Sequence, residues 1–180
     1  MIFEKYNTRT NYWDEMALPN GDIRSHYQSI FKQLNTINLD ILNKKEEIAK
    51  KTFMNQGITF TVYSENEEGI ERIFPFDIIP RIITANDWDF LEKGITQRLK
   101  ALNLFLKDIY NEQHIIKDGI VPAKLIVSCP HYNREVFGIS VPYDIYVHIA
   151  GIDLVRDSDG TYYVLEDNLR TPSGVSYMLE

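Results

Sequence analysis

Gly151-Ile-Asp-Leu-Val-Arg156 and Tyr162-Tyr-Val-Leu-Glu-Asp-Asn168 flank an Asp159-Gly160 pair, and this stretch decides the fold of the chain. Asp-Gly between two apolar runs is a strong short-range signal for a β-hairpin, usually with a two-residue type I′ loop. The sequence therefore predicts two antiparallel strands that reverse at Asp159-Gly160.

The register of the predicted hairpin follows from that loop length. With a two-residue loop, Ser158 pairs with Thr161, and counting back along both strands sets Asp153 opposite Glu166. Side chains on a strand alternate between faces, so Glu166 and Asn168 would share the face that Asp153 occupies. A loop longer by one residue would reverse this arrangement.

Three oxygen-bearing side chains on one face predict a metal site. Two carboxylates directly opposite each other repel unless a cation lies between them. Mg²⁺ commonly binds one or two carboxylates together with substrate phosphates, which suits Asp153, Glu166 and Asn168 better than a full Ca²⁺ cage. The alternative is a solvated hairpin face that carries ordinary acids.

The residues after the hairpin point to an anion. Arg170-Thr-Pro-Ser-Gly174 reads as a turn that leads into a helix with Ser173 as N-cap. Free N–H groups at a helix N-terminus and a forked arginine both attract phosphate or carboxylate groups. Alternatively, Arg170 forms a structural salt bridge with Asp167 or another acid.

Several stretches of the chain resemble the circularly permuted ATP-grasp family. That family is similar to glutathionylspermidine synthetase and, more distantly, to carboxylate–amine ligases. The resemblance runs from about Tyr12 to Glu180, and its last block is the most specific. The matching stretches are Gln56–Tyr63, Glu71–Arg81, Arg98–Tyr110, Val147–Asp157 and Val164–Tyr177.

The resemblance implies roles for the residues of the last block. Asp153, Glu166 and Asn168 match the family residues that hold one or two Mg²⁺ ions against the phosphates of ATP. Arg170 matches a catalytic position near the transferred phosphoryl group or the substrate carboxylate. With Ser173 and Gly174, it would also bind the cofactor.

The reaction implied by the resemblance forms an amide or peptide bond in two steps. A small-molecule or peptide carboxylate attacks the γ-phosphate of ATP to give an acylphosphate, and an amine then displaces phosphate. Catalysis of this kind depends mainly on positioning and charge neutralisation. Metal-dependent phosphate-ester hydrolysis with the same ligands is an alternative.

The sequence departs from the family pattern at its end. Family members carry the lysines and strands that clamp the nucleotide after the magnesium block, whereas this sequence stops at Glu180. We expect a downstream region or a second polypeptide to complete the nucleotide site. The chain alone would then be a metal-binding half, and a non-catalytic fragment or partner subunit is the other alternative.

Composition limits the class of protein. The 180 residues are 44% hydrophobic and 12% aromatic, which suffices for a core, and the net charge of −7 argues against nucleic-acid or anionic-membrane binding. Cys129 is the single cysteine, which excludes internal disulfides, and we expect it to be buried. No signal peptide or membrane span is visible, so we expect a cytoplasmic protein.

Periodicity predicts helices and strands that form an α/β fold with a mixed sheet. The resemblance implies that this is the N-terminal part of a circularly permuted ATP-grasp fold with helices before it. We expect an arm over residues 1–20 and one domain over residues 21–180. The expected elements are a helix capped by Asp22, a helix over Leu39–Phe53, a hairpin of Ile58–Tyr63 with Ile70–Phe76, a long helix with an apolar stripe from Trp88 to Ile109, and a strand over Tyr143–Ile149.

Overall fold

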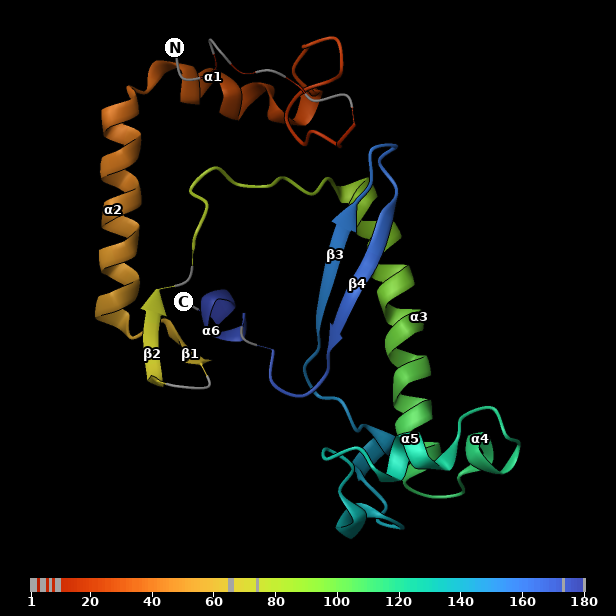
Figure 1. The fold of residues 1–180 in the computed structure, drawn as a ribbon. Coiled ribbons are helices and arrows are strands. Elements are labelled where there is room, and N and C mark those ends of the chain that lie inside the picture. The colour runs from red at the N-terminus through yellow and green to blue at the C-terminus, as the bar shows by residue number, and fades with distance from the viewer. Residues whose placement is uncertain are drawn as a thin grey trace. The chain divides into compact units, whose positions relative to one another are not determined.

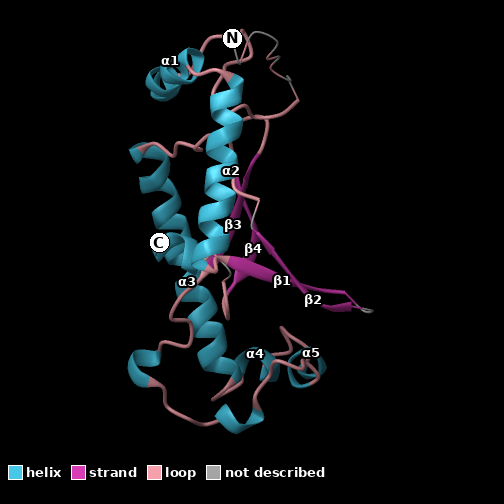
Figure 2. Ribbon diagram, turned by 90° about the vertical axis from the view of Figure 1, so that its left-hand side faces the viewer, coloured by secondary structure: helices cyan, strands magenta, loops and turns pink. Residues whose placement is uncertain are grey.

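The computed structural model describes residues 3, 6, 8, 11–64, 67–73, 75–172 and 174–179. The chain divides into two compact units. Unit 1 comprises Met1–Thr84, Gly151–Asp167 and Pro172–Glu180, and unit 2 comprises Ala85–Ala150 and Asn168–Thr171. The predicted division into residues 1–20 and 21–180 stays a prediction. Figure 1 colours the chain from red to blue, and Figure 2 colours it by secondary structure.

Unit 1 opens with the two predicted helices. A 3-10 turn over Ser25–Tyr27 leads into α1, Gln28–Thr36, and α2 spans Leu39–Gln56. The side chain of Asn38 accepts a hydrogen bond from the Asp40 N–H and caps the start of α2. Gly57, with φ of 69°, ends α2 in the left-handed conformation that glycine adopts easily. Periodicity thus predicted both helices, but the predicted cap at Asp22 is wrong, because α1 starts after Tyr27 and has no side-chain cap.

The strands form two separate hairpins. In unit 1, β1 (Thr59–Ser64) pairs antiparallel with β2 (Glu67–Ile73), and the ladder is irregular between Val62 and Ser64. The second hairpin consists of β3 (Gly151–Arg156) and β4 (Tyr162–Asn168), drawn in blue in Figure 1. Among the described residues each sheet has two strands, so the predicted mixed sheet is wrong. The combination of helices with small antiparallel hairpins is what the structure contains.

The core of unit 1 is built around Tyr27, which is 2% exposed. Its ring packs with the buried Met16 and Leu34. The Tyr27 hydroxyl accepts a hydrogen bond from the Ile82 N–H at 2.8 Å and donates to the Pro80 carbonyl at 3.2 Å. Burial raises the pKa of this phenol. Tyr27 therefore ties the start of α1 to the segment that follows β2.

Unit 2 begins with the long predicted helix. α3 spans Ala85–Ile109 and buries Leu91 and Ile109 from the predicted apolar stripe, although Trp88 is 52% exposed. The short helices α4 (His114–Lys117) and α5 (Ala123–Val127) follow. No helix among the described residues combines the length and apolar character needed to cross a membrane.

Stacked tyrosines organise the core of unit 2. Tyr110, at the end of α3, stacks on Tyr132 with ring centroids 5.0 Å apart and on Tyr146 with centroids 6.1 Å apart. The Tyr110 hydroxyl accepts a hydrogen bond from the Asn133 N–H. Ile109 and Ile126 are buried beside these rings. The loop after α5 is thus anchored on the end of α3.

Asp108 holds the turn between α3 and α4. Its carboxylate accepts hydrogen bonds from the backbone N–H groups of Ile115 and His114, each at 2.9 Å, and lies 2.9 Å from the His114 Nδ1. These donors stabilise the charged form and lower the pKa of Asp108, the Ile115 N–H contributing most.

The predicted strand over Tyr143–Ile149 is wrong. The chain there forms a 3-10 turn at Pro142–Asp144 and then irregular backbone. Tyr143 and Asp144 have φ values of 57° and 56°, which an extended strand excludes. The N–H groups of Tyr146 and Val147 donate to the side-chain oxygen of Asn103 on α3 instead of to a neighbouring strand. A side chain distant in sequence, that of Asn103, therefore accepts the hydrogen bonds that a neighbouring strand would otherwise accept.

Candidate functional site

The turn of the β3–β4 hairpin is longer than predicted. The Asp157 N–H donates to the Thr161 carbonyl at 2.9 Å, and the Gly160 N–H donates to the Asp157 carbonyl at 2.8 Å. Gly160 has φ of 88°. Together these features describe a type I turn followed by a left-handed residue, the three-residue hairpin with a G1 bulge. The loop is Ser158-Asp159-Gly160, and the predicted two-residue loop is wrong.

The longer loop moves the register by one residue. Counting back from the bonded Asp157 and Thr161 along an uninterrupted ladder sets Asp153 opposite Leu165, and Glu166 opposite Ile152. The Arg156 Nη1 donates a hydrogen bond to the Tyr162 hydroxyl, which agrees with this count, because the count sets these two residues opposite each other.

Burial separates the two faces of the hairpin in the same way. The exposed face carries Asp153, Val155, Tyr163 and Leu165, and every one of these side chains is exposed. Their neighbours along each strand are half-buried up to Val164. Counted from this loop along an uninterrupted ladder, Asp153 therefore pairs with Leu165 instead of the predicted Glu166.

The oxygen atoms of the predicted magnesium ligands suit the ion, whereas their placement in the hairpin suits it less well. Carboxylate and amide oxygens suit Mg²⁺, and Glu166 and Asn168 lie two residues apart in β4, the spacing that puts side chains on one face. The new register assigns Asp153 to the opposite face. Glu166 belongs to unit 1 and Asn168 to unit 2. The three-residue set stays a prediction that depends on the resemblance.

The part of the chain that the structure describes holds no cluster of three or more His, Cys, Asp and Glu side chains suited to a metal ion. Cys129 is exposed, contrary to expectation, because it lies in the turn after α5 rather than in the core.

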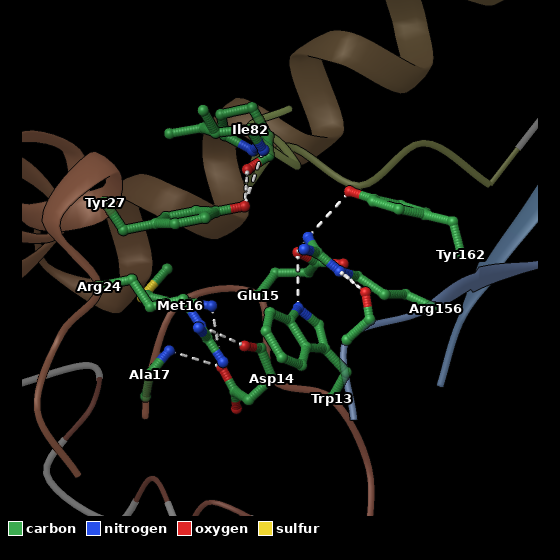
Figure 3. Close-up of polar contacts among 12 residues, drawn as sticks. Trp13, Asp14, Glu15, Met16, Ala17, Arg24, Tyr27, Ile82, Arg156 and Tyr162 are labelled. Atoms are coloured by element: carbon green, nitrogen blue, oxygen red, sulfur yellow. Dashed lines mark hydrogen bonds and ion pairs between the residues drawn. The ribbon is translucent and has the colours of Figure 1, made fainter. Parts of the chain in front are cut away.

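The tip of the hairpin is held by a cluster that the sequence did not predict (Figure 3). We name Trp13, Arg24, Arg156 and Gly160 the turn clamp. The guanidinium carbons of Arg24 and Arg156 lie 3.8 and 4.2 Å from the centroid of the Trp13 ring. Such cation–π contacts contribute roughly 0.5–2 kcal/mol each, more when they are desolvated. Trp13 therefore connects the N-terminal segment to β3.

Arg156 fixes the loop from within the hairpin. Its Nε donates to the Gly160 carbonyl at 2.9 Å, and its Nη1 donates to the Tyr162 hydroxyl at 2.8 Å. Glu15 lies 3.5 Å from the same Nη1 and accepts a hydrogen bond from the Trp13 Nε1 at 3.1 Å. The arginine side chain is only 15% exposed, so these contacts are shielded from water.

The N-terminal side of the turn clamp is held by Asp14. Its carboxylate accepts hydrogen bonds from the N–H groups of Met16 and Ala17 and from the hydroxyl of Tyr6. The bond from the hydroxyl raises the pKa of Tyr6 to about 12. The Asp14 carbonyl in turn accepts a hydrogen bond from the Arg24 Nε at 2.9 Å. Trp13 is thereby presented to the hairpin by a folded segment.

Arg170 has a partner that the sequence did not predict. Its Nη1 lies 3.3 Å from the Nδ1 of His131, and both side chains are exposed. No salt bridge to Asp167 or another acid is formed by Arg170 among the described residues. The residues are 39 positions apart in the chain, and a histidine in a polar loop is a weak sequence signal.

The remaining predicted cofactor residues lie at the C-terminal turn. Ser173 is outside the described residues. Gly174 is exposed and precedes α6, Val175–Leu179, where its carbonyl accepts a hydrogen bond from the Met178 N–H. The predicted helix is present, but a helix of five residues has only a small dipole. The roles of Ser173 and Gly174 in cofactor binding stay predictions.

Comparison with known proteins agrees with the resemblance. Residues 80–180, more than half of the chain, match the family described as a circularly permuted ATPgrasp. An uncharacterized protein of Mycobacterium leprae (strain TN) is 46% identical over 182 residues, which cover 99% of this chain and 32% of that protein. An uncharacterized protein of Synechocystis sp. (strain PCC 6803) is 46% identical over 170 residues, covering 94% of this chain and 35% of that protein.

Another relative carries a functional name. A protein of Frankia casuarinae, named putative glutamate–cysteine ligase 2-2, is 39% identical over 179 residues, which cover 99% of this chain and 20% of that protein. The chain therefore spans about a third or less of the length of these curated relatives. With the matched region, this chain belongs to the circularly permuted ATP-grasp family.

Proposed function

We propose that this chain supplies the metal-binding part of an ATP-dependent ligase that joins a carboxylate to an amine through an acylphosphate. The observation that carries the proposal is the family match over residues 80–180, which includes Glu166, Asn168 and Arg170 at alternate positions. Oxygen ligands followed by an arginine suit phosphoryl transfer, because that reaction needs its charge neutralised more than it needs a nucleophilic side chain.

Each residue of the block has a role in this proposal. Glu166 and Asn168 would hold magnesium with one carboxylate and one amide oxygen from the same strand. When bound, the ion would offset the negative charge of the nucleotide phosphates. Arg170 would donate hydrogen bonds to an equatorial phosphoryl oxygen. Its guanidinium is exposed and already oriented by His131.

Asp153 is proposed as the third ligand on the resemblance alone. The hydrogen bonds of the loop assign it to the opposite face from Glu166. We therefore expect that removal of Glu166 weakens metal binding more than removal of Asp153 does. If all three ligands contributed equally to the site, the two substitutions would weaken metal binding equally.

The name of the Frankia relative suggests a substrate pair. Glutamate offers a carboxylate and cysteine an amine, which is the combination that an acylphosphate-forming ligase requires. We propose amino acids or short peptides as substrates, with ATP as the phosphoryl donor. Because the longer relatives contain much more chain, we also propose that a further region completes the nucleotide site.

The metal-binding part can be tested on this chain. Mn²⁺, used as a spectroscopic probe for Mg²⁺, should bind to the chain without nucleotide, and Glu166→Gln should abolish that binding. Asp167→Asn, a neighbouring acid at the next position of β4, should leave it intact. Equal binding by the wild-type chain and Glu166→Gln would contradict the assignment. Circular dichroism of both variants shows whether the fold is kept.

The reaction class is tested on the full-length Mycobacterium leprae relative, because its extra chain can hold the rest of the site. ADP release that requires both glutamate and cysteine, or another acid and amine, supports the ligase. Phosphate release without an amine supports metal-dependent hydrolysis instead. Absence of nucleotide turnover with every acid–amine pair tried favours a non-catalytic partner subunit.

A further inference from the structure

The pairing of Arg170 with His131 carries an inference about how this site recognises its anion. The two residues come from Asn168–Thr171 and from the loop after α5, both in unit 2. An arginine has N–H donors and no acceptor. The Nδ1 of His131, 3.3 Å from the Arg170 Nη1, must therefore offer its lone pair, which assigns the ring proton to Nε2.

The choice of partner is informative because this chain is rich in acids. It has 26 Asp and Glu residues against 19 Lys and Arg, so carboxylates are the commoner potential partners. A carboxylate would orient the guanidinium but would also neutralise its charge. A neutral imidazole orients the same group through one hydrogen bond and leaves the positive charge and the other four N–H donors for a ligand.

We propose that His131 is a positioning residue that orients the Arg170 guanidinium toward a phosphoryl group and leaves its positive charge uncompensated. The ligand class is a dianionic phosphate oxyanion, such as inorganic phosphate or the phosphoryl group of the proposed reaction. The guanidinium fork binds two phosphate oxygens, and His131 fixes the direction of the fork without contacting the anion. This inference rests on the proposed function only in taking that phosphoryl group as the natural ligand.

The experiment measures binding of inorganic phosphate to the 180-residue chain by calorimetry, with EDTA present and ionic strength held constant. Arg170→Gln should weaken binding roughly tenfold or more, since it removes charge-assisted hydrogen bonds. Acetate, the carboxylate probe, should bind more weakly than phosphate. Unchanged phosphate binding by Arg170→Gln, or equal affinity for acetate, overturns the proposal.

Three substitutions at His131 separate positioning from a general structural effect. His131→Asn keeps an uncharged acceptor near the Nδ1 position and should bind phosphate like the wild-type chain. His131→Phe removes the acceptor and should weaken binding several-fold. His131→Asp restores an acceptor but neutralises the guanidinium, and it should weaken binding at least as much as His131→Phe. Circular dichroism checks that each variant is folded.

The outcomes of this series are distinct. If His131→Asp bound phosphate with wild-type affinity, the uncompensated charge of Arg170 would have no part in phosphate binding. If His131→Asn bound phosphate as weakly as His131→Phe, the hydrogen-bond acceptor at position 131 would have no part in it. Either result overturns the proposal. Phosphate binding that follows the expected pattern while no ligase activity is found would keep this inference and reject the proposed function.

Discussion

Replacing Gly160 by alanine tests the turn clamp directly. Gly160 has φ of 88°, and a Cβ built on it would lie 2.6 Å from Trp13 Cζ3 and 2.9 Å from Trp13 Cη2. The indole cannot easily withdraw, because the guanidinium groups of Arg24 and Arg156 lie over its ring. The substitution must therefore displace the ring from the hairpin tip or distort the loop.

The expected cost is the sum of two effects. A left-handed conformation costs an alanine roughly 1–2 kcal/mol relative to glycine. Overpacking against a fixed side chain typically costs about 1–3 kcal/mol more. Gly160→Ala should therefore lower the free energy of unfolding of unit 1 by roughly 2–5 kcal/mol, a large share of the stability of a small domain.

Gly21→Ala is the matched control. Gly21 has φ of 87°, almost the value at Gly160, and an added Cβ there meets no atom within 4 Å. Both substitutions reduce the freedom of the unfolded chain equally, so the difference between them isolates the contact with Trp13. The assay is urea unfolding followed by tryptophan fluorescence in a Trp88→Phe background, which leaves Trp13 as the only tryptophan.

Equal destabilisation by Gly160→Ala and Gly21→Ala would refute the reasoning, because it would mean that the indole does not press on the loop. A second measurement makes the test independent of the unfolding baseline. In a Trp13→Ala background, with unfolding followed by circular dichroism because the fluorescent reporter is gone, the two glycine substitutions should cost the same, since the group that Gly160→Ala meets is gone.

Three further predictions concern the hairpin register and unit 2. The three-residue loop predicts a nuclear Overhauser effect between the Hα atoms of Leu154 and Val164, whereas the two-residue loop predicts one between Val155 and Val164. Asn103→Ala should lower the free energy of unfolding of unit 2 by about 1–3 kcal/mol, measured by Trp88 fluorescence, because two backbone N–H groups lose their acceptor. Asp108→Asn should destabilise unit 2 at neutral pH in thermal melts, and the difference from wild type should vanish in acid.

The sign of the Asp108 prediction follows from its lowered pKa. A carboxyl group whose pKa is lower in the folded chain stabilises the fold above its ordinary pKa, and this stabilisation is lost as the pH falls through the lower, folded value. A pH-independent difference would contradict it. Asp118→Asn, an exposed acid at the end of α4, is the control for general charge effects.

Local signals predicted the helices of this chain well. The N-cap at Asn38 and the left-handed Gly57 enclose α2 without help from distant residues, so its bounds were accessible from the sequence. The apolar stripe of α3 gave its length and its buried face. The prediction of a strand over Tyr143–Ile149 was wrong because backbone N–H groups of this segment donate to Asn103, about forty residues earlier. No local sequence pattern indicates such a contact.

The candidate site was predicted in part, and the reason is specific. Asp159-Gly160 signalled the hairpin correctly, but Asp-Gly suits both a type I′ loop and a type I turn with a G1 bulge. The observed loop is contacted by Arg156, which donates a hydrogen bond to the Gly160 carbonyl, and by Trp13, nearly 150 residues earlier, and the local pattern reports neither contact. A single added loop residue then reversed the face assigned to Asp153.

The turn clamp therefore bears on the proposed metal site without touching it. Trp13 packs on the loop at Gly160, and the loop length decides whether Asp153 or Ile152 lies opposite Glu166. If all three predicted ligands serve one ion, the ladder must contain a compensating bulge between the loop and Asp153. A chain in which Trp13→Ala changed metal affinity, with Glu166 and Asn168 intact, would show that the N-terminal segment sets the register of the site.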